Sequence, residues 1–431
     1  MRKHLKYLGI LLCMVVFLVA CDNKNQNTDT TEAANTTEQS QEKTEETEIT
    51  FMIPDWGAPT DEMLEEFKNE TGITVNVLPT SWDDIRDKIA TVAVGKQVAA
   101  DVFEVDWSWT GEFHAADWLM PIDMSDEDKE DMPTIKSFTI GDEVLAVPYA
   151  NDFRIAFYNK EMFDKVGADA PKTWDELIDA CKKLKEQGIC EYPIGLPLKA
   201  DESTSTTLMW LAYSRNNKFF NDDDTINKEA VKDGLTVIEK IVKEGLVDPA
   251  NAENTGQMAY AKILSEEAAF MIGPSSYVTR VNDPEKSKVV DKIMPILLPG
   301  IEKEADVTVP FAEAVGISKY TKNPEAAEKW VKWYTSKENQ LKMFNDLSAL
   351  PTRNSVLNGL IEDGTIKNSG AMVDLAKMIE SPFPNGVPKY YTKMSTEIFN
   401  TVNQMTSGKL TADEAANKIE ENVNKIVEEN K

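Results

Sequence analysis

Acidic residues stand next to tryptophans in two short stretches of the sequence, Asp55-Trp56 and the "DWSW" of residues 106–109. Carboxylate oxygens accept hydrogen bonds from hydroxyl groups, and the face of an indole covers the weakly apolar C–H face of a sugar ring. Acids and aromatic faces together also suit an ammonium group. The two stretches therefore predict a binding site for a neutral polyol or, as the alternative, for a cationic ligand such as a polyamine.

The two stretches follow segments with the pattern of buried strands, residues 48–54 and 101–105. Between them the pattern predicts a helix capped by Thr60, a strand over 73–79 and a helix that begins near Ser81. This alternation predicts a largely parallel sheet with right-handed crossovers. Ligands of such sheets bind at the carboxyl ends of the strands, where both acid–tryptophan stretches lie.

Within "DWSW", an extended backbone would place Trp107 and Trp109 on one side and Asp106 on the other. The two indoles are then candidate stacking faces, and Asp106 either accepts hydrogen bonds from the ligand or holds its own loop in place.

The rest of the chain repeats the α/β pattern and is too long for one core, so we expect two lobes. Predicted strands cover 145–149, 155–159, 192–197 and 268–273. Predicted helices follow Thr173, Asn227, Asn323 and Thr411, and another covers 388–407.

The first 21 residues have a basic start and a short apolar run that ends in Leu18-Val19-Ala20-Cys21. This layout is typical of a secretory signal, and its apolar run is too short to predict a membrane span. It resembles the lipobox of bacterial lipoproteins, in which Cys21 would be lipidated; the alternative is an ordinary signal peptide. Residues 22–47 have almost no apolar content and predict a disordered tether.

The net charge of −28 makes nucleic acid an improbable partner, because phosphate binding needs clustered basic residues. Cys181 and Cys190 could form a disulfide in an extracytoplasmic protein. No Cys/His spacing typical of a metal site occurs, and no cofactor is expected. A Gly-x-Ser-x-Gly elbow is absent as well. A secreted glycoside hydrolase, with two of the acids as its catalytic pair, is the weaker enzymatic alternative.

Several segments, in order and spacing, resemble the family 1 extracellular solute-binding proteins of bacterial ABC importers, the maltose-binding-protein-like group. They include "LEEFKNETGITVNV", "VPYANDFRIAFYNKEMFDKVG", "EEAAFMIGPSSY", "VGISKYTKNPEAAEKWVKWYTS" and "LTADEAANKIEENVNKI". The resemblance covers about residues 48–431. It implies a two-lobed α/β fold, each lobe a mainly parallel sheet flanked by helices, with the ligand in a cleft at a multi-strand hinge. Residues 48–150 with about 313–352 would form the first lobe, and 151–312 with about 353–431 the second.

The resemblance also implies site residues. Asp152 falls where relatives often place an acidic sugar contact, Glu313 lies near a second crossing, and hinge Asn151 could donate and accept hydrogen bonds. In the second lobe Tyr277 stands near the usual stacking tryptophan, and Tyr390, or alternatively Tyr391, at a C-terminal aromatic. Trp210 could stack on ligand or belong to a helix core.

The implied protein is a monomeric, membrane-anchored receptor on the outer face of the bacterial cytoplasmic membrane. It would capture a mono- or oligosaccharide by lobe closure and deliver it to an ABC permease, without catalysis.

Overall fold

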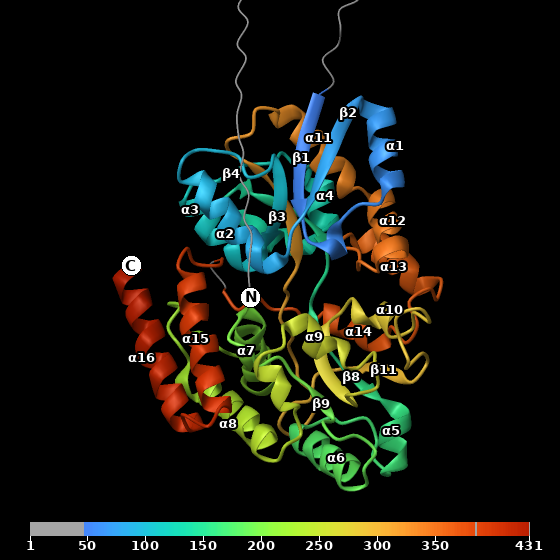
Figure 1. The fold of residues 1–431 in the computed structure, drawn as a ribbon, viewed down its shortest axis with the longest axis vertical. Coiled ribbons are helices and arrows are strands. Elements are labelled where there is room, and N and C mark those ends of the chain that lie inside the picture. The colour runs from blue at the N-terminus through green and yellow to red at the C-terminus, as the bar shows by residue number, and fades with distance from the viewer. Residues whose placement is uncertain (1–46, 384–385, 431) are drawn as a thin grey trace, which may run out of the picture. The chain divides into compact units, whose positions relative to one another are not determined.

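The computed structural model describes residues 47–383 and 386–430. In these ranges the chain forms two sheets, each accompanied by its own helices, and Figure 1 shows them as two groups. The predicted two-lobed α/β fold is confirmed. The predicted signal segment, Cys21 and the tether up to residue 46 lie outside the described residues. No helix in the described ranges is long and apolar enough to cross a bilayer.

The first lobe contains a six-stranded sheet with the order β2-β1-β3-β12-β4, in which β7 also pairs with β12. The two N-terminal strands pair in parallel over their whole length, and β1 pairs in parallel with β3. The strands are β1 (Thr47–Ile53), β2 (Ile73–Pro79), β3 (Val102–Asp106), β4 (Leu119–Met120), β7 (Ala146–Ala150) and β12 (Glu313–Ser318).

The expectation of mainly parallel sheets needs correction, because β12 runs antiparallel to β3, β4 and β7. This strand returns to the first lobe from the other side of the molecule, so it enters the sheet in the opposite direction. Its register puts Glu313 beside Asp106 on β3 and Ala150 on β7. The antiparallel pairing thereby brings two of the predicted site acids to the same sheet edge.

Local sequence signals explain the helices of the first lobe. Thr60 Oγ1 accepts a hydrogen bond from the Met63 amide at the start of α1, and Gly72 ends it with a φ of +72°. Phe51 of β1 and Phe67 of α1 both contact the buried Trp330 of α11, with ring centroids 5.5 and 4.9 Å away. The helices are α1 (Asp61–Thr71), α2 (Trp82–Ala93), α3 (Thr110–Ala115), α4 (Asp126–Asp131), α11 (Pro324–Tyr334), α12 (Lys337–Leu347) and α13 (Asn354–Glu362).

Short elements fill the loops of the first lobe. They are the 3-10 helices η1 (Asp55–Gly57), η2 (Trp107–Trp109) and η3 (Pro133–Phe138) and the two-stranded pair of β5 (Thr139–Ile140) and β6 (Glu143–Val144).

The second lobe contains a four-stranded sheet with the order β11-β8-β10-β9, also of mixed direction. Its strands are β8 (Arg154–Asn159), β9 (Ile194–Gly195), β10 (Phe270–Pro274) and β11 (Ile293–Ile296). The longer helices α7, α8, α15 and α16 pack on one another. The helices are α5 (Lys160–Lys165), α6 (Trp174–Glu186), α7 (Glu202–Asn216), α8 (Lys228–Lys243), η4 (Pro249–Ala252), α9 (Gly256–Ala261), α10 (Tyr277–Arg280), α14 (Gly370–Ala376), α15 (Tyr391–Thr406) and α16 (Ala412–Asn430).

The possible disulfide between Cys181 and Cys190 is not formed, and both are buried free thiols. Cys181 belongs to the buried face of α6, whereas Cys190 lies beyond the left-handed turn at Gly188. The Cys190 thiol donates instead to the carbonyl of Glu267 at 3.4 Å. Burial raises the pKa of both thiols, which keeps them protonated.

Three segments pass between the lobes and are hydrogen-bonded to one another. The Asn151 amide donates to the Leu350 carbonyl at 2.8 Å, and the Phe311 amide donates to the Asp152 carbonyl at 3.0 Å. The Asn151 side chain adds a bond to the Pro351 carbonyl at 2.7 Å. The predicted boundaries after residues 150 and 312 fall in or next to these segments, whereas α13, beyond the predicted boundary near 352, packs on α12 of the first lobe. The lobe boundaries remain a prediction.

Candidate functional site

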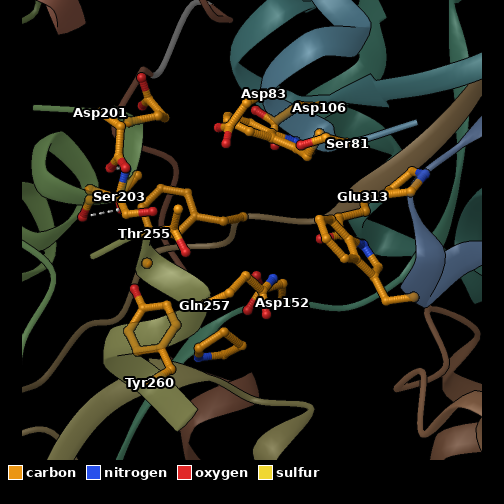
Figure 2. A pocket seen from close by; sticks show the side chains of 18 of the residues that line it. Ser81, Asp83, Asp106, Asp152, Asp201, Ser203, Thr255, Gln257, Tyr260 and Glu313 are labelled. Carbon is orange, nitrogen blue, oxygen red and sulfur yellow. Dashed lines mark hydrogen bonds between the residues drawn. The ribbon is translucent and has the colours of Figure 1, made fainter. Parts of the chain in front are cut away.

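A cavity of about 360 Å³ lies between the two lobes. One wall comes from the ends of β1, β2 and β3, and the other from the starts of α7 and α9 (Figure 2). The connecting segments supply the floor, including Asp152, Arg154 and Phe311. The site therefore lies where the sequence predicted it, at the carboxyl ends of the strands.

Six of the predicted binding residues line this cavity. A smaller cavity of about 40 Å³ shares part of its lining and includes two more, Asn151 and Tyr277. The six are Asp55, Trp56, Asp106, Trp107, Asp152 and Glu313.

The loop after β3 does not keep the extended geometry that the sequence analysis assumed. Residues 107–109 form a turn of 3-10 helix, so alternation no longer governs where their side chains point. Trp107 lines the cavity, with its ring centroid 4.9 Å from that of Phe311. Asp106 accepts from the Ser108 amide at 2.8 Å and from its hydroxyl at 2.5 Å, so this acid both faces the cavity and pins its own loop.

Trp109 does not line the cavity. It is 3 % exposed and packs behind Trp82, with ring centroids 5.2 Å apart, and against Phe113. The 3-10 turn rotates it away from Trp107, which is the physical reason for this correction. Trp82 takes its place on the cavity wall.

Trp210 and Tyr390 also lie off the cavity. Trp210 is 1 % exposed and stacks on Trp174 inside the second lobe, so the helix-core alternative describes it. The Tyr390 hydroxyl donates to Asp224 at 2.8 Å. Its alternative, Tyr391, supports the site from behind, because its ring packs on Trp107 and its hydroxyl donates to Glu202 at 2.6 Å.

Several cavity residues escaped the sequence analysis. Trp82 and Asp83 follow the carboxyl end of β2, so the rule that identified the other two loops also applies to this one. The second-lobe residues carried no comparable signal, because they stand at helix starts far away in the chain. The missed residues include Thr80, Ser81, Trp82, Asp83, Arg154, Asp201, Glu202, Ser203, Thr206, Thr255, Gly256, Gln257, Tyr260 and Phe311.

Carboxylates dominate the chemistry of the cavity. Seven of them line it, and Arg154 is its one basic lining residue in the part of the chain that the structure describes. The Arg154 guanidinium is committed to Asp152, with Nη1 and Oδ1 2.5 Å apart. The seven are Asp55, Asp83, Asp106, Asp152, Asp201, Glu202 and Glu313.

Burial shifts the titration of these acids. It raises the pKa of Glu202 and of Glu313 to about 8 and that of Asp106 to about 6. Hydrogen bonds oppose the shift: Trp56 Nε1 donates to Glu313 at 2.6 Å, and Tyr391 donates to Glu202. The negative charge of Asp152 adds to the shift at Glu313.

A fully buried acid, Glu104, lies behind Glu313. The Tyr149 hydroxyl is 2.9 Å from Glu104 Oε2 and 3.0 Å from Glu313 Oε2. A phenol has one proton to donate, so the second contact requires a protonated carboxyl. Burial raises the pKa of Glu104 as well, and Glu313 adds to the effect, which agrees with a shared proton in this group.

The lobes also touch beside the cavity, between α3 and the start of α15. A Cβ added at Gly111 would lie 2.0 Å from the Val387 carbonyl oxygen, so only glycine permits this approach. Glu112, the next residue, accepts hydrogen bonds from Arg86 at 2.7 Å and from Thr392 at 3.2 Å. This contact joins the first lobe to the C-terminal part of the second.

We expect Gly111→Ala to lower the free energy of unfolding by about 1–3 kcal/mol, because the added methyl overpacks the contact. Urea unfolding measures the loss. Gly359→Ala is the matched control, since nothing lies within 4 Å of a Cβ there and the position is helical. Equal stabilities of the two variants would contradict the role given to Gly111.

Comparisons with known proteins agree with this architecture. Residues 53–341 match the family described as bacterial extracellular solute-binding protein. The maltodextrin-binding protein MdxE of Bacillus subtilis (strain 168) is 22% identical over 379 residues, 83% of this chain and 85% of that protein. A putative binding protein of Brucella abortus (strain 2308) is 27% identical over 215 residues, 47% of this chain, and the match spans about half, 52%, of that relative.

Solved structures share the fold. A solute-binding protein of Agrobacterium radiobacter K84 in complex with ribitol superposes with a TM-score of 0.79 at 19% identity, over 88% of this chain and 98% of that one. The maltose-bound T. maritima MalE3 gives a TM-score of 0.75 at 22% identity, over 88% and 99%.

Proposed function

We propose, from the premise that the chain belongs to the bacterial extracellular solute-binding proteins, that it captures a carbohydrate between its lobes and delivers it to an ABC permease. The observation that carries the proposal is the lining of the cavity, in which indole faces stand next to carboxylates. The maltodextrin-binding protein and the two similar structures that hold maltose and ribitol support the ligand class. The lipobox-like segment at Cys21 supports a lipid anchor outside the cytoplasmic membrane.

The mechanism follows from the two walls. A ligand that contacts both lobes only when they are together favours the closed state by that difference in affinity. Trp56 and Trp107 would cover the apolar ring faces, and the acids would accept from the hydroxyl groups. No chemical step is needed, and the closed form would then dock on the permease.

Thermal unfolding of residues 22–431, with a panel of neutral mono- and oligosaccharides, tests the proposal. A ligand at about 100 times its Kd should add about 2.7 kcal/mol to the stability of the folded state. In Trp56→Ala this stabilisation should be lost, because Trp56 is a half-buried wall of the cavity. In Trp210→Phe the core should weaken while the ligand still stabilises the protein. A panel without any effect would contradict the proposal.

A further inference from the structure

The charge of the cavity goes beyond what a neutral sugar needs. Of its seven carboxylates, only Asp152 and Asp201 have an ion-pair partner among the described residues. Asp152 is paired with Arg154 at 2.5 Å, and Asp201 Oδ2 lies 3.8 Å from Lys199 Nζ. The five others have no ion pair there: Asp55, Asp83, Asp106, Glu202 and Glu313. Because Glu202 and Glu313 have a pKa of about 8 and are largely protonated at neutral pH, the unpaired carboxylates are Asp55, Asp83 and Asp106.

Acids stand on both walls of the cavity. Asp83 belongs to α2 of the first lobe, and Asp201 caps α7 of the second (Figure 2). Burial raises the pKa of Asp201 to about 6, and the negative charge of Asp83 adds to that shift across the cavity. Burial raises the pKa of Glu202 to about 8, and the negative charge of Asp106 adds to that shift, so a proton relieves the repulsion between these two acids at neutral pH. Bringing the lobes together therefore brings like charges together, and a neutral ligand leaves this repulsion in place.

The rest of the lining suits a cation. Trp56 and Trp107 line the same space, and aromatic faces attract an ammonium group. The Phe311 ring, also in the lining, already has the Arg154 guanidinium 4.8 Å from its centre. The Tyr260 hydroxyl, on a side chain 4 % exposed, lines the cavity and has no hydrogen-bond partner in the described part of the chain. Within that part, no three His, Cys, Asp or Glu side chains are grouped as metal ligands, which favours an organic cation.

We propose that the ligand of this cavity carries an ammonium group, held between the unpaired carboxylates and the aromatic faces. The inference rests on the proposed carbohydrate function, and an amine-bearing sugar satisfies both. The ring faces of the sugar would cover the indoles, and the amine would supply positive charge to the acids that make no ion pair, since the one cavity arginine, Arg154, is paired with Asp152.

Three disaccharides that differ only at C2 isolate the charge. They are the β-1,4-linked dimers of glucosamine, N-acetylglucosamine and glucose, each supplied at up to 10 mM, with spermidine as a linear amine. Calorimetry and thermal unfolding measure binding to residues 22–431. We expect the glucosamine dimer to bind at least about tenfold more tightly than either neutral dimer, since even partly exposed charge pairs add up over several acids.

Charge-neutral variants separate the cavity from the acidic surface. Asp55→Asn and Asp83→Asn remove exposed cavity charges whose carboxylates make no side-chain hydrogen bond within the described residues, so folding should be preserved. Each should weaken binding of the amine by about three- to fivefold more than it weakens binding of the neutral dimers, because asparagine still offers the hydroxyl groups an acceptor oxygen. Asp142→Asn makes the same charge change at an exposed position outside the lining and should change nothing.

The outcomes distinguish this inference from the proposed function. Equal binding of the amine and neutral dimers overturns the inference and keeps the carbohydrate function. If spermidine binds and no sugar does, the result supports a positively charged ligand and overturns the proposed carbohydrate function. If Asp142→Asn weakens amine binding as much as Asp55→Asn does, the preference for the amine comes from attraction to the acidic surface, and the inference is overturned. If neither amine binds at 10 mM, the inference is overturned as well. If no sugar binds either, the proposed function is also contradicted.

Discussion

Arg154→Met should lower the free energy of unfolding by about 3 kcal/mol or more at pH 8, because it leaves Asp152 buried without a counter-charge. The side chains of Arg154 and Asp152 are only 8% and 16% exposed, and their charged atoms are 2.5 Å apart. The guanidinium also lies 4.8 Å from the centre of the Phe311 ring, so its removal loses a cation–π contact. Urea unfolding with linear extrapolation gives the difference.

The double variant Asp152→Asn with Arg154→Met tests the cause. It removes both charges, so it should recover most of the stability lost in the single variant. Lys160→Met is the surface control, because its pair with Asp164 is about half exposed on both sides and its loss should have little effect on stability. A double variant as unstable as the single one would assign the loss to packing and would contradict the charge argument.

The sequence predicts much of the first lobe because its signals are local. Thr60, Gly72 and the alternation over residues 73–79 each determine a helix end or a strand, and the structure has all three. The same holds in the second lobe for Thr173, whose capping box with Glu176 is present at the start of α6. These features depend on residues three to five apart, which the sequence shows directly.

The sheet direction could not be predicted in this way. Strand β12 pairs with β3, more than 200 residues earlier in the chain, and no local pattern encodes that partner. The alternation of strands and helices predicted parallel crossovers, but a chain that leaves a lobe and returns can add an antiparallel strand. The residue pattern and the chain length predicted an α/β protein of two lobes. The family resemblance added the arrangement in which the ligand cleft lies at a multi-strand hinge.

The candidate site likewise contains residues that local sequence signals identify and residues whose place depends on distant contacts. Asp55, Trp56, Asp106 and Trp107 could be identified because they directly follow predicted strands. Trp109 could not be placed, since a single turn of 3-10 helix decides on which side it lies. The second wall depends on how α7 and α9 meet the first lobe, and no local pattern encodes that contact or the acids that face each other across the cavity.

Stability should fall as the pH rises from 5 to 8.5. Glu202 and Glu313 have a pKa of about 8 in the folded protein, against an ordinary value of 4.5. The folded state therefore holds protons that the unfolded chain releases, and the free energy of unfolding decreases with pH in this window. The stabilising contribution is complete below about pH 4.5 and is lost as the pH rises through 8. Because each pKa unit corresponds to about 1.4 kcal/mol, we expect a loss of at least about 2 kcal/mol.

Glu202→Gln should make this decline shallower, because glutamine has no proton to release and can still accept from Tyr391. Glu362→Gln, an exposed position on α13, should leave the decline unchanged. Urea unfolding at four or more pH values between 5 and 8.5 gives both slopes. A flat or rising stability of the parent protein would show that water in the cavity solvates these carboxylates fully. A steep decline that Glu202→Gln reduces would instead place the proton at the junction of α7 and α15, where α7 begins the second wall of the cavity.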